Sequence, residues 1–214
     1  MKDIAIYGSE GFGKEVACLL DLINKENPQW NLVGFFDDTK PKGVKISHFG
    51  ETLGGAQELN AYPKRIAIVI AAGHQNAVKT IYGKITNDNV EFPNIISPLV
   101  RFADKETFKI GKGNIIQSNC FFSCNVKIGN FNVFNGSNTF GHDDVVGDFN
   151  AFMPASRVSG NVFIGYNNFF GVGSIIIEKL KIGHDVRIGA GGILMTKPKD
   201  GMLYIGNPAK IVKF

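Results

Sequence analysis

The sequence has few of the residues that define several other classes of protein. Its 214 residues include three cysteines, an odd number that argues against a disulfide framework and fits a reducing compartment. No apolar run approaches the roughly 18 residues that a membrane span requires. The first residues read as a strand, without the apolar stretch and cleavage site of a signal peptide. We therefore expect a cytoplasmic protein with no membrane span.

The excess of positive charge is also small. The formal net charge is +4, which is too weak and too dispersed to argue for nucleic acid as a partner. It permits anionic small molecules such as nucleotides or coenzyme A. Apolar residues make up 44% of the chain and charged residues 20%, which indicates an ordinary globular protein.

A six-residue period dominates the chain from Ile110 to Leu194. Every sixth residue in this stretch is large and apolar, fifteen times in succession, and glycine follows eight of them. This period fits neither a helix nor a single strand but is typical of a β-helix, whereas a β-sandwich would keep it only by chance. Three hexads should form one triangular coil of eighteen residues, giving five coils and a prism about 24 Å tall. We expect the glycines to supply unusual backbone angles at the turns.

The region before the prism alternates strand and helix patterns. This alternation predicts a small parallel βαβαβ sheet, a Rossmann-like domain over residues 1–96, followed by the β-helix domain with its C-terminal tail over residues 97–214. The expected elements are strands at 3–7, 31–36, 65–71 and 90–96 and helices at 14–24 and 76–84.

Two motifs lie where the strands of such a sheet end. Gly8, Gly11 and Gly13 separate a strand from a helix, where backbone N–H groups hold anions; a tight turn with close packing is the alternative. Asp37 and Asp38 end the second strand, where they could bind a ribose or uracil edge or serve as solvated turn residues.

His142 is the candidate catalytic residue of the prism. The hexad pattern directs it outward, acidic residues follow it, and Gly160, eighteen residues later, leaves space over its imidazole. This arrangement favours a general base, although a surface histidine is the alternative. Cys124, eighteen residues earlier, makes a Cys–His nucleophilic pair conceivable. His184 lies on a different corner, so a shared metal site is not expected.

Together these segments resemble the bacterial sugar acetyltransferases of the sialic acid O-acetyltransferase and nucleotide-aminosugar N-acetyltransferase group. The similarity covers nearly the whole chain and is carried by residues 6–13, 36–38, 72–73, 142–143, 159–162 and 206–210. It implies a left-handed β-helix, a homotrimer and acetyl-CoA bound between neighbouring prisms. It also implies that His142 deprotonates the acceptor amine or hydroxyl with help from Asp143, which requires a local bend because successive strand residues point to opposite sides.

The resemblance further implies two sets of binding residues. The acceptor, a nucleotide-linked sugar, would be bound by Gly8, Glu10, Gly11, Phe12, Asp37, Asp38 and Gly73. Acetyl-CoA would be contacted by Ala151, Gly160, Val172 and Ala190. Basic residues at the end of the prism either bind the coenzyme phosphates or form a solvated tail; they are Lys197, Lys199, Lys210 and Lys213.

Two positions depart from the family pattern. Phe12 replaces a histidine of the glycine loop, and Ala151 replaces a second histidine nine residues after the first. The sequence thus predicts a metal-independent, acetyl-CoA-dependent acetyltransferase acting on a sugar amine or hydroxyl in surface glycan biosynthesis. The alternatives are an acyltransferase on a non-sugar acceptor and a non-catalytic nucleotide-binding trimer. A carbonic anhydrase would need three histidine ligands per site, which the two prism histidines do not supply.

One further feature concerns assembly. The outer faces of the expected prism carry more aromatic surface than a monomer normally leaves exposed, which predicts a closed three-fold trimer. The residues are Phe121, Phe131, Phe149, Phe163 and Phe169.

Overall fold

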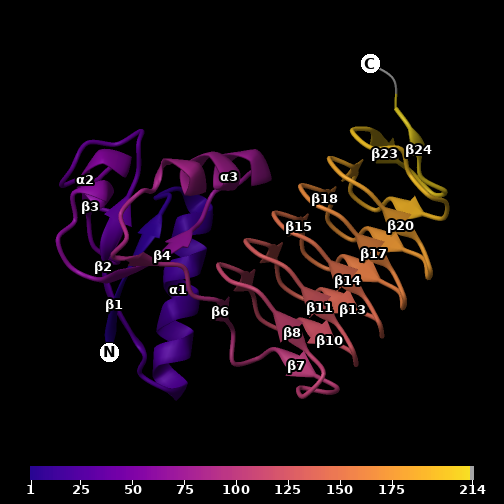
Figure 1. Ribbon diagram of the computed structural model, residues 1–214, viewed down its shortest axis with the longest axis horizontal. Helices are drawn as coiled ribbons and strands as arrows, with labels where there is room; N and C mark the ends of the chain where they lie inside the picture. Colours follow the sequence, from indigo (N-terminus) through magenta and orange to yellow (C-terminus); the bar gives the residue numbers. More distant parts are fainter. Residues whose placement is uncertain (213–214) are drawn as a thin grey trace. The chain divides into compact units, whose positions relative to one another are not determined.

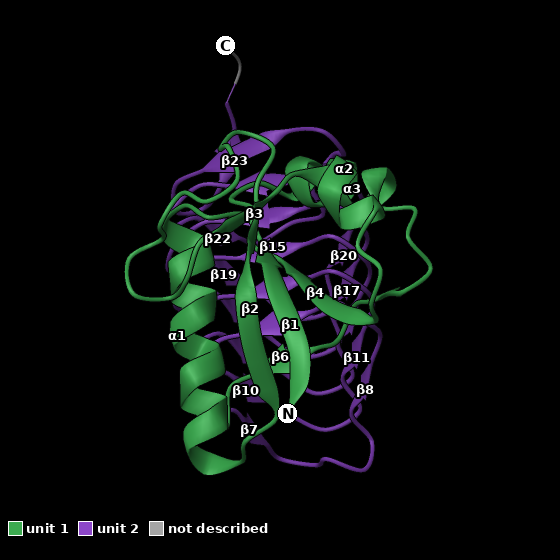
Figure 2. Cartoon of the chain, turned by 90° about the vertical axis from the view of Figure 1, so that its left-hand side faces the viewer, with its two compact units in different colours: residues 1–98 green, residues 99–214 purple. Residues whose placement is uncertain are grey.

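The computed structural model describes residues 1–212, so Lys213 of the basic tail lies outside the described residues. The chain divides into two compact units, Met1–Pro98 and Leu99–Phe214 (Figure 2). The first is a small α/β unit and the second a parallel β-solenoid (Figure 1), which confirms the expected fold class.

The first unit is built on a five-stranded sheet in the order β3-β2-β1-β4-β5, with every pairing parallel. Helix α1 packs on β1 and β2 through an apolar stripe that includes Val16, Leu20 and Ile23. The strands are β1 (Lys2–Tyr7), β2 (Trp30–Phe36), β3 (Thr52–Gly54), β4 (Ile66–Ile70) and β5 (Val90–Glu91). The helices are α1 (Gly11–Glu26), α2 (Ala56–Asn60) and α3 (Gln75–Lys84).

The expected elements of this unit are present, with three differences. Helix α1 begins at Gly11 rather than Lys14. The expected strand at 90–96 is two strands, β5 and β6 (Ile95–Ile96), separated at Pro93, which has no N–H to donate to a ladder. The short elements β3 and α2 had no recognisable pattern in the sequence, because each has too few residues to show a period.

The solenoid has three faces built mainly of two-residue strands, most of which pair in parallel with the strand eighteen residues away. We call the faces first, second and third in the order in which the chain visits them. The first face contains β7 (Arg101–Phe102), β10 (Phe121–Phe122), β13 (Thr139–Phe140), β16 (Arg157–Val158), β19 (Ile175–Ile176) and β22 (Ile193–Leu194). The second contains β8 (Lys109–Ile110), β11 (Lys127–Ile128), β14 (Val145–Val146), β17 (Phe163–Ile164) and β20 (Lys181–Ile182). The third contains β9 (Ile115–Ile116), β12 (Val133–Phe134), β15 (Ala151–Phe152), β18 (Phe169–Phe170), β21 (Arg187–Ile188), β23 (Leu203–Ile205) and the antiparallel β24 (Lys210–Ile211).

The second residue of each strand forms the core, as the six-residue period predicts. All fifteen apolar positions except the half-exposed Ile110 are buried. On the third face the rings of Phe134, Phe152 and Phe170 stack at centroid distances of 5.1 and 4.5 Å. These identical side chains pack on one another from coil to coil, which stabilises the register of the three coils that contain them.

The glycines after these positions have a different role from the one expected. Gly129 and Gly147 do not have a positive φ. A Cβ on Gly129 would lie 2.7 Å from the carbonyl oxygen of Gly147, and one on Gly147 would lie 2.5 Å from that of Gly165. The expectation of unusual backbone angles was therefore wrong, because these glycines permit the close approach of successive coils.

The left-handed positions lie two residues further along each turn. Asn125, Asp143 and Asn161 have φ values of 59°, 60° and 59°. Asparagine and aspartate tolerate this conformation better than most residues. Many turns therefore bend at a polar residue, although Phe131, Phe149 and Ala155 adopt the same conformation at other corners. The bend determines where the side chains of the turn point.

The expectation for Phe131 was also wrong. Its side chain is only 4% exposed, and its ring stacks on that of Phe149 at 5.4 Å, over the space left by Gly113. Phe163 is 47% exposed, as expected for an outer face.

Candidate active site

His142 lies on the corner between β13 and β14, at residues 141–144, which we call the His142 corner. Its side chain is 62% exposed, and its Nδ1 lies 2.7 Å from Oδ2 of Asp143. Adjacent side chains can meet here because the backbone of Asp143 adopts the left-handed conformation. The local bend that the sequence analysis required is therefore present. The carboxylate orients the imidazole and can stabilise its protonated form.

Asn125 orients the carboxylate in turn, a role that the sequence analysis missed. Its Nδ2 donates a hydrogen bond of 3.0 Å to Oδ1 of Asp143. Hydrogen bonds from His142 and then from Asn125 hold the pKa of Asp143 below its ordinary value. The signal was available, because Asn125 precedes Asp143 by one coil of eighteen residues.

Gly160 lies against His142 in the next coil, on the corner at residues 159–162, which we call the Gly160 corner. A Cβ on Gly160 would come within 2.6 Å of Nε2 of His142, so any side chain there would cover this nitrogen. The backbone N–H of Asn161 donates to the carbonyl of His142 at 2.7 Å. These contacts place Nε2 beside a position that cannot carry a side chain.

Cys124 occupies the preceding coil and is half-buried. Its carbonyl accepts a hydrogen bond from the backbone N–H of Asp143 at 3.0 Å. Among residues 1–212 we find no hydrogen bond between its thiol and His142. The described contacts therefore give no support to a Cys–His nucleophilic pair.

The residues expected to contact the coenzyme occupy several places on the solenoid. Val172 and Ala190 lie one coil apart on the exposed corner between the third and first faces. Ala151 is only 5% exposed within β15, between Val133 and Phe169. The remaining residues of the set are Gly160, at His142, and the exposed Lys197 and Lys210 near the end of the chain.

The glycine loop of the first unit divides into packing and open positions. A Cβ on Gly8 would lie 2.4 Å from the carbonyl oxygen of Ala71, and one on Gly13 would lie 2.0 Å from that of Gly8. Gly11 and Gly73 have no atom within 4 Å of an added Cβ among the described residues. Gly8 and Gly13 therefore serve packing, whereas Gly11, with Glu10 exposed before it and Phe12 half-buried after it, lies at the open N-terminus of α1.

Asp37 is fixed by hydrogen bonds at the end of β2. Oδ2 accepts from the backbone N–H and the hydroxyl of Ser9 at 3.0 and 2.5 Å, and Oδ1 accepts from those of Thr39 at 2.9 and 2.6 Å. Burial alone would raise the pKa of Asp37, but these hydrogen bonds outweigh it and lower the pKa to about 2. Asp37 therefore connects the glycine loop to the end of the next strand.

Asp38 connects three elements around the same edge of the sheet. It accepts hydrogen bonds from the Tyr7 hydroxyl at 2.6 Å and the Ala56 N–H at 2.9 Å, and it pairs with Lys84 at 2.7 Å. Burial opposes the effect, but the bonds from Lys84 and Tyr7 lower the pKa of Asp38. Burial and the bond to Asp38 raise the pKa of Tyr7, so its hydroxyl stays a donor.

A pocket of about 320 Å³ opens beside these acids. Asp37, Asp38, Lys40, Lys42 and Gly55 contribute to its lining. Lys40 also bonds the Ser9 hydroxyl at 2.8 Å and pairs with Glu10 at 2.5 Å. The two lysines, which the sequence analysis did not single out, give the pocket cations at the carboxyl ends of parallel strands, where open α/β sheets bind ligands.

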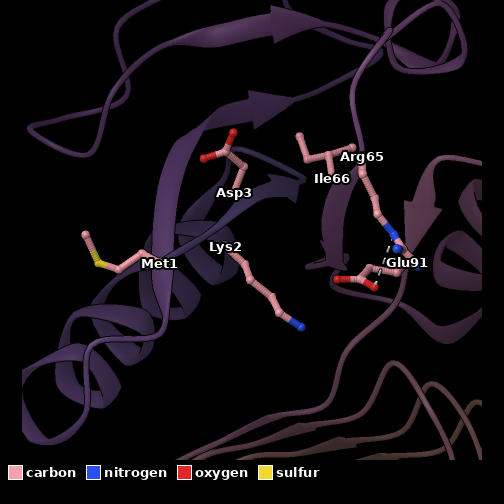
Figure 3. Close-up of a pocket in the computed structure, with 6 residues that line it drawn as sticks. All are labelled: Met1, Lys2, Asp3, Arg65, Ile66 and Glu91. Atoms are coloured by element: carbon pink, nitrogen blue, oxygen red, sulfur yellow. Dashed lines mark ion pairs between the residues drawn. The ribbon is translucent and has the colours of Figure 1, made fainter.

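A second pocket, of about 400 Å³, lies at the opposite ends of the strands (Figure 3). It is lined by the first residues of β1 and β4 and by Glu91, which pairs with Arg65 at 4.0 Å. The amino ends of parallel strands are not the usual ligand edge, so the first pocket is the better candidate for a ligand site.

Neither a metal cluster nor a membrane helix is found in residues 1–212. No group of three or more His, Cys, Asp or Glu side chains in this range could hold a metal ion. None of the helices in this range is long and apolar enough to cross a membrane.

Comparison with known proteins supports the resemblance seen in the sequence. Residues 3–85 match the family described as the PglD N-terminal domain. No curated protein matches the sequence. The acetyltransferase domain of PglB from Neisseria gonorrhoeae, in complex with acetyl coenzyme A, is similar over 99% of each chain, with a TM-score of 0.87 and 25% identity.

Two other solved structures are similar over the same length. WeeI from Acinetobacter baumannii has a TM-score of 0.86 and 25% identity, over 99% of this chain and 100% of that one. PerB from Caulobacter crescentus, in complex with CoA and GDP-perosamine, has a TM-score of 0.86 and 24% identity, over 100% of this chain and 98% of that one. Residues 3–85 of the first unit are therefore similar to the PglD N-terminal domain, and the whole chain shares the fold of these acetyltransferase structures.

Proposed function

We propose that this protein is an acetyl-CoA-dependent acetyltransferase that acts on an amine or hydroxyl of a nucleotide-linked sugar in the biosynthesis of a surface glycan. The observation that carries the proposal is the His142–Asp143 pair, whose exposed imidazole keeps Nε2 uncovered beside Gly160. The acetyl coenzyme A bound by the PglB domain supports the choice of co-substrate.

In the proposed reaction His142 is the general base. Nδ1–H donates to Asp143, which leaves Nε2 to accept the proton of the acceptor amine or hydroxyl as that atom attacks the thioester carbonyl. The new C–N or C–O bond forms as the C–S bond breaks, and the thiolate of CoA leaves and takes up the proton. Asp143, as a carboxylate, stabilises the imidazolium that exists between these steps.

The first unit would supply acceptor binding. Lys40 and Lys42 at the pocket offer cations for the phosphates of a nucleotide, and the open N-terminus of α1 adds backbone donors near Gly11. Asp37 and Asp38 already have donors from the protein, so they would orient the pocket as well as contact the nucleoside. Phe12, where relatives of this type tend to carry histidine, would present an apolar surface to the acceptor.

The coenzyme would lie along the exposed corners of the solenoid, with Val172, Ala190 and Gly160 as contacts and the terminal lysines near its phosphates. We propose that the solenoid forms a closed trimer, because exposed side chains such as Phe163 and Val172 need cover. Light scattering should give three times the chain mass of 23.3 kDa. A mass of one chain at micromolar concentration would contradict the trimer.

A binding and transfer experiment tests the function. UDP-, GDP-, dTDP- and CMP-linked aminosugars are screened with CoA for a rise in Tm, because a ligand that binds the folded state stabilises it. Each binder is then incubated with acetyl-CoA, and the product mass and released thiol are measured. A gain of one acetyl group with stoichiometric thiol release is expected. Binding without transfer by any acceptor would instead favour a nucleotide-binding protein.

A further inference from the structure

A carboxyl group is buried two residues after His142. Asp144 has no exposed surface, and the residues at the same position in the coils before and after it are Val126 and Val162. An aspartate between two valines is costly unless its polar atoms are satisfied. The proposed reaction gives Asp144 no role.

Only one of the two carboxyl oxygens has a partner. Oδ1 accepts a hydrogen bond of 2.8 Å from the backbone N–H of Val162, which belongs to the Gly160 corner. Oδ2 is buried and has no hydrogen-bond partner within residues 1–212. Asp144 thus joins the His142 corner to the Gly160 corner through only one of its two carboxyl oxygens.

The other turns of the solenoid show which contact the second polar side-chain atom makes at this position. Asparagines hold the same position, immediately before a strand, on other corners. Oδ1 of Asn132 accepts from the N–H of Asn150, eighteen residues later, as Oδ1 of Asp144 does from Val162. At four of these positions the side-chain amide donates a hydrogen bond of 2.8 to 3.0 Å to the backbone carbonyl fifteen residues later. The pairs are Asn114 to Gly129, Asn138 to Met153, Asn150 to Gly165 and Asn168 to Gly183.

By this repeat, Oδ2 of Asp144 takes the place of the amide nitrogen, and the carbonyl fifteen residues later is that of Ser159. A carboxylate has no hydrogen to donate to a carbonyl, whereas a protonated carboxylic acid has one. Only the neutral acid reproduces the pattern that the asparagines show four times.

The charges around Asp144 agree with this geometry. Burial raises the pKa of Asp144 to about 7, despite the lowering effect of the backbone N–H groups of Val162 and Gly141. Within its own corner, His142 lowers and Asp143 raises the pKa. The coil before contributes the thiol of Cys124, and residues 159–162 of the coil after contain no ionisable side chain.

We propose that Asp144 is a positioning residue that acts as a neutral carboxylic acid, hydrogen-bonding the His142 corner to the Gly160 corner through Val162 and Ser159. Ionisation of Asp144 turns the Ser159 contact from attraction to repulsion and loosens the approach of Gly160 to the imidazole. Activity therefore declines as the pH rises past neutral. This effect on activity rests on the proposed function, whereas the protonation of Asp144 does not.

The sign of the stability effect follows from the raised pKa. The folded protein holds this proton more tightly than the unfolded chain, whose aspartate has its ordinary pKa of 3.8. The stabilisation is fully present below pH 3.8 and is lost as the pH rises to about 7. A variant whose side chain at position 144 cannot ionise should not show this loss of stability.

The experiment compares wild type with Asp144→Asn, the neutral isostere, and uses Asp185→Asn as the matched control. Asp185 is an exposed aspartate of another corner that accepts from Asn167. Between pH 5 and pH 8.5 the Tm of Asp144→Asn should rise relative to wild type by roughly 5 °C or more, whereas the control should keep a constant difference. Infrared difference spectra of wild type against Asp144→Asn should show a protonated carboxyl band that disappears near neutral pH.

The activity measurement separates positioning from packing. At pH 7 Asp144→Asn should keep kcat within about threefold of wild type, and at pH 8.5 it should retain kcat while wild type loses several-fold, with KM for acetyl-CoA unchanged. Asp144→Val gives this position the valine found at residues 126 and 162 of the adjacent coils. This variant should fold but have a lower kcat at every pH. Identical pH profiles for wild type and Asp144→Asn would overturn the positioning role.

The remaining outcomes are also decisive. A carboxylate band at pH 5.5, or an Asp144→Asn chain that fails to fold, would overturn the neutral acid, because the isostere should satisfy the same partners. If no acceptor is ever acetylated, the proposed function fails, but the Tm and infrared measurements still decide the state of Asp144.

Discussion

Oδ2 of Asp143 lies 2.7 Å from Nδ1 of His142, although the two residues are adjacent in the chain. In an extended strand their side chains would point to opposite sides. The left-handed φ of 60° at Asp143 brings them together, and the turn holds this bend through the hydrogen bond from the Asp143 N–H to the carbonyl of Cys124. The pair is therefore built into the turn and is held in place by the preceding coil.

Replacing the base is the first prediction. His142→Ala should lower kcat by about 10² to 10⁴, the usual contribution of general-base catalysis, because the acceptor then attacks while it retains its proton. KM for both substrates should change little, because the lost interaction belongs to the transition state. Steady-state kinetics measure both constants.

His184 supplies the control for this variant. It is the other solenoid histidine, and its ring stacks on Tyr166 at 3.7 Å, on a different corner. His184→Ala should keep most of the activity. A His142→Ala enzyme that keeps more than about a tenth of wild-type kcat would place the base elsewhere.

The second prediction concerns the support of Asp143 by Asn125. Asn125→Ala removes the donor to Oδ1, so the carboxylate can rotate away from His142. We expect this variant to lower kcat by roughly tenfold with KM unchanged. Asp143→Asn should lower kcat by at least as much. Because both variants affect one unit, the double variant should cost little more than Asp143→Asn alone. If the double variant lost kcat by the product of the two single-variant losses, Asn125 would act independently of Asp143.

Cys124 provides a test of direct transfer. If the acetyl group passes directly to the acceptor, Cys124→Ala should leave kcat within about threefold of wild type. Mass spectrometry of the enzyme incubated with acetyl-CoA alone should find no acetyl group on this residue. A trapped acetyl-Cys124 that is discharged by the acceptor would establish a covalent mechanism instead.

Acid stability of the first unit follows from Asp37. Its pKa of about 2 lies below the ordinary 3.8, so the carboxylate stabilises the folded state above pH 3.8 and the stabilisation is lost as the pH falls through about 2. Asp37→Asn should lower the free energy of unfolding at pH 7 by about 2 kcal/mol. The deficit should shrink on acidification, as measured by urea unfolding between pH 7 and pH 2.

Asp3 offers a matched control for this measurement. It also accepts a side-chain hydrogen bond, from Asn31, but the contact is exposed. Asp3→Asn should change the free energy of unfolding by less than about 0.5 kcal/mol. Equal effects at Asp3 and Asp37 would contradict the assigned role of the Ser9 and Thr39 hydrogen bonds.

The terminal lysines are the last prediction. Lys197 and Lys210 are exposed, and the double change Lys197→Ala, Lys210→Ala should raise KM for acetyl-CoA several-fold with kcat nearly unchanged, as expected when uniform binding is lost. The effect should weaken at high salt, because exposed charges are screened. An unchanged KM at low salt would show that these charges do not contact the coenzyme.

The sequence by itself determined the solenoid and its register. A six-residue period is a local property, and each coil repeats the same contacts, so positions from Ile116 to Leu194 could be assigned to the core without knowing the structure. The strands and helices of the first unit were readable for the same reason, wherever they were long enough to show a period.

Tertiary structure decided what depends on contacts between coils or on backbone angles. The hexad glycines proved to be sites of close approach, because the distance from Gly129 to Gly147 is set only when the coils stack. Phe131 was buried by its stacking on Phe149. The pairing of His142 with Asp143 required a left-handed residue. The hydrogen bond of Asp144 to Val162 required the neighbouring coil, because eighteen residues of chain separate the two residues.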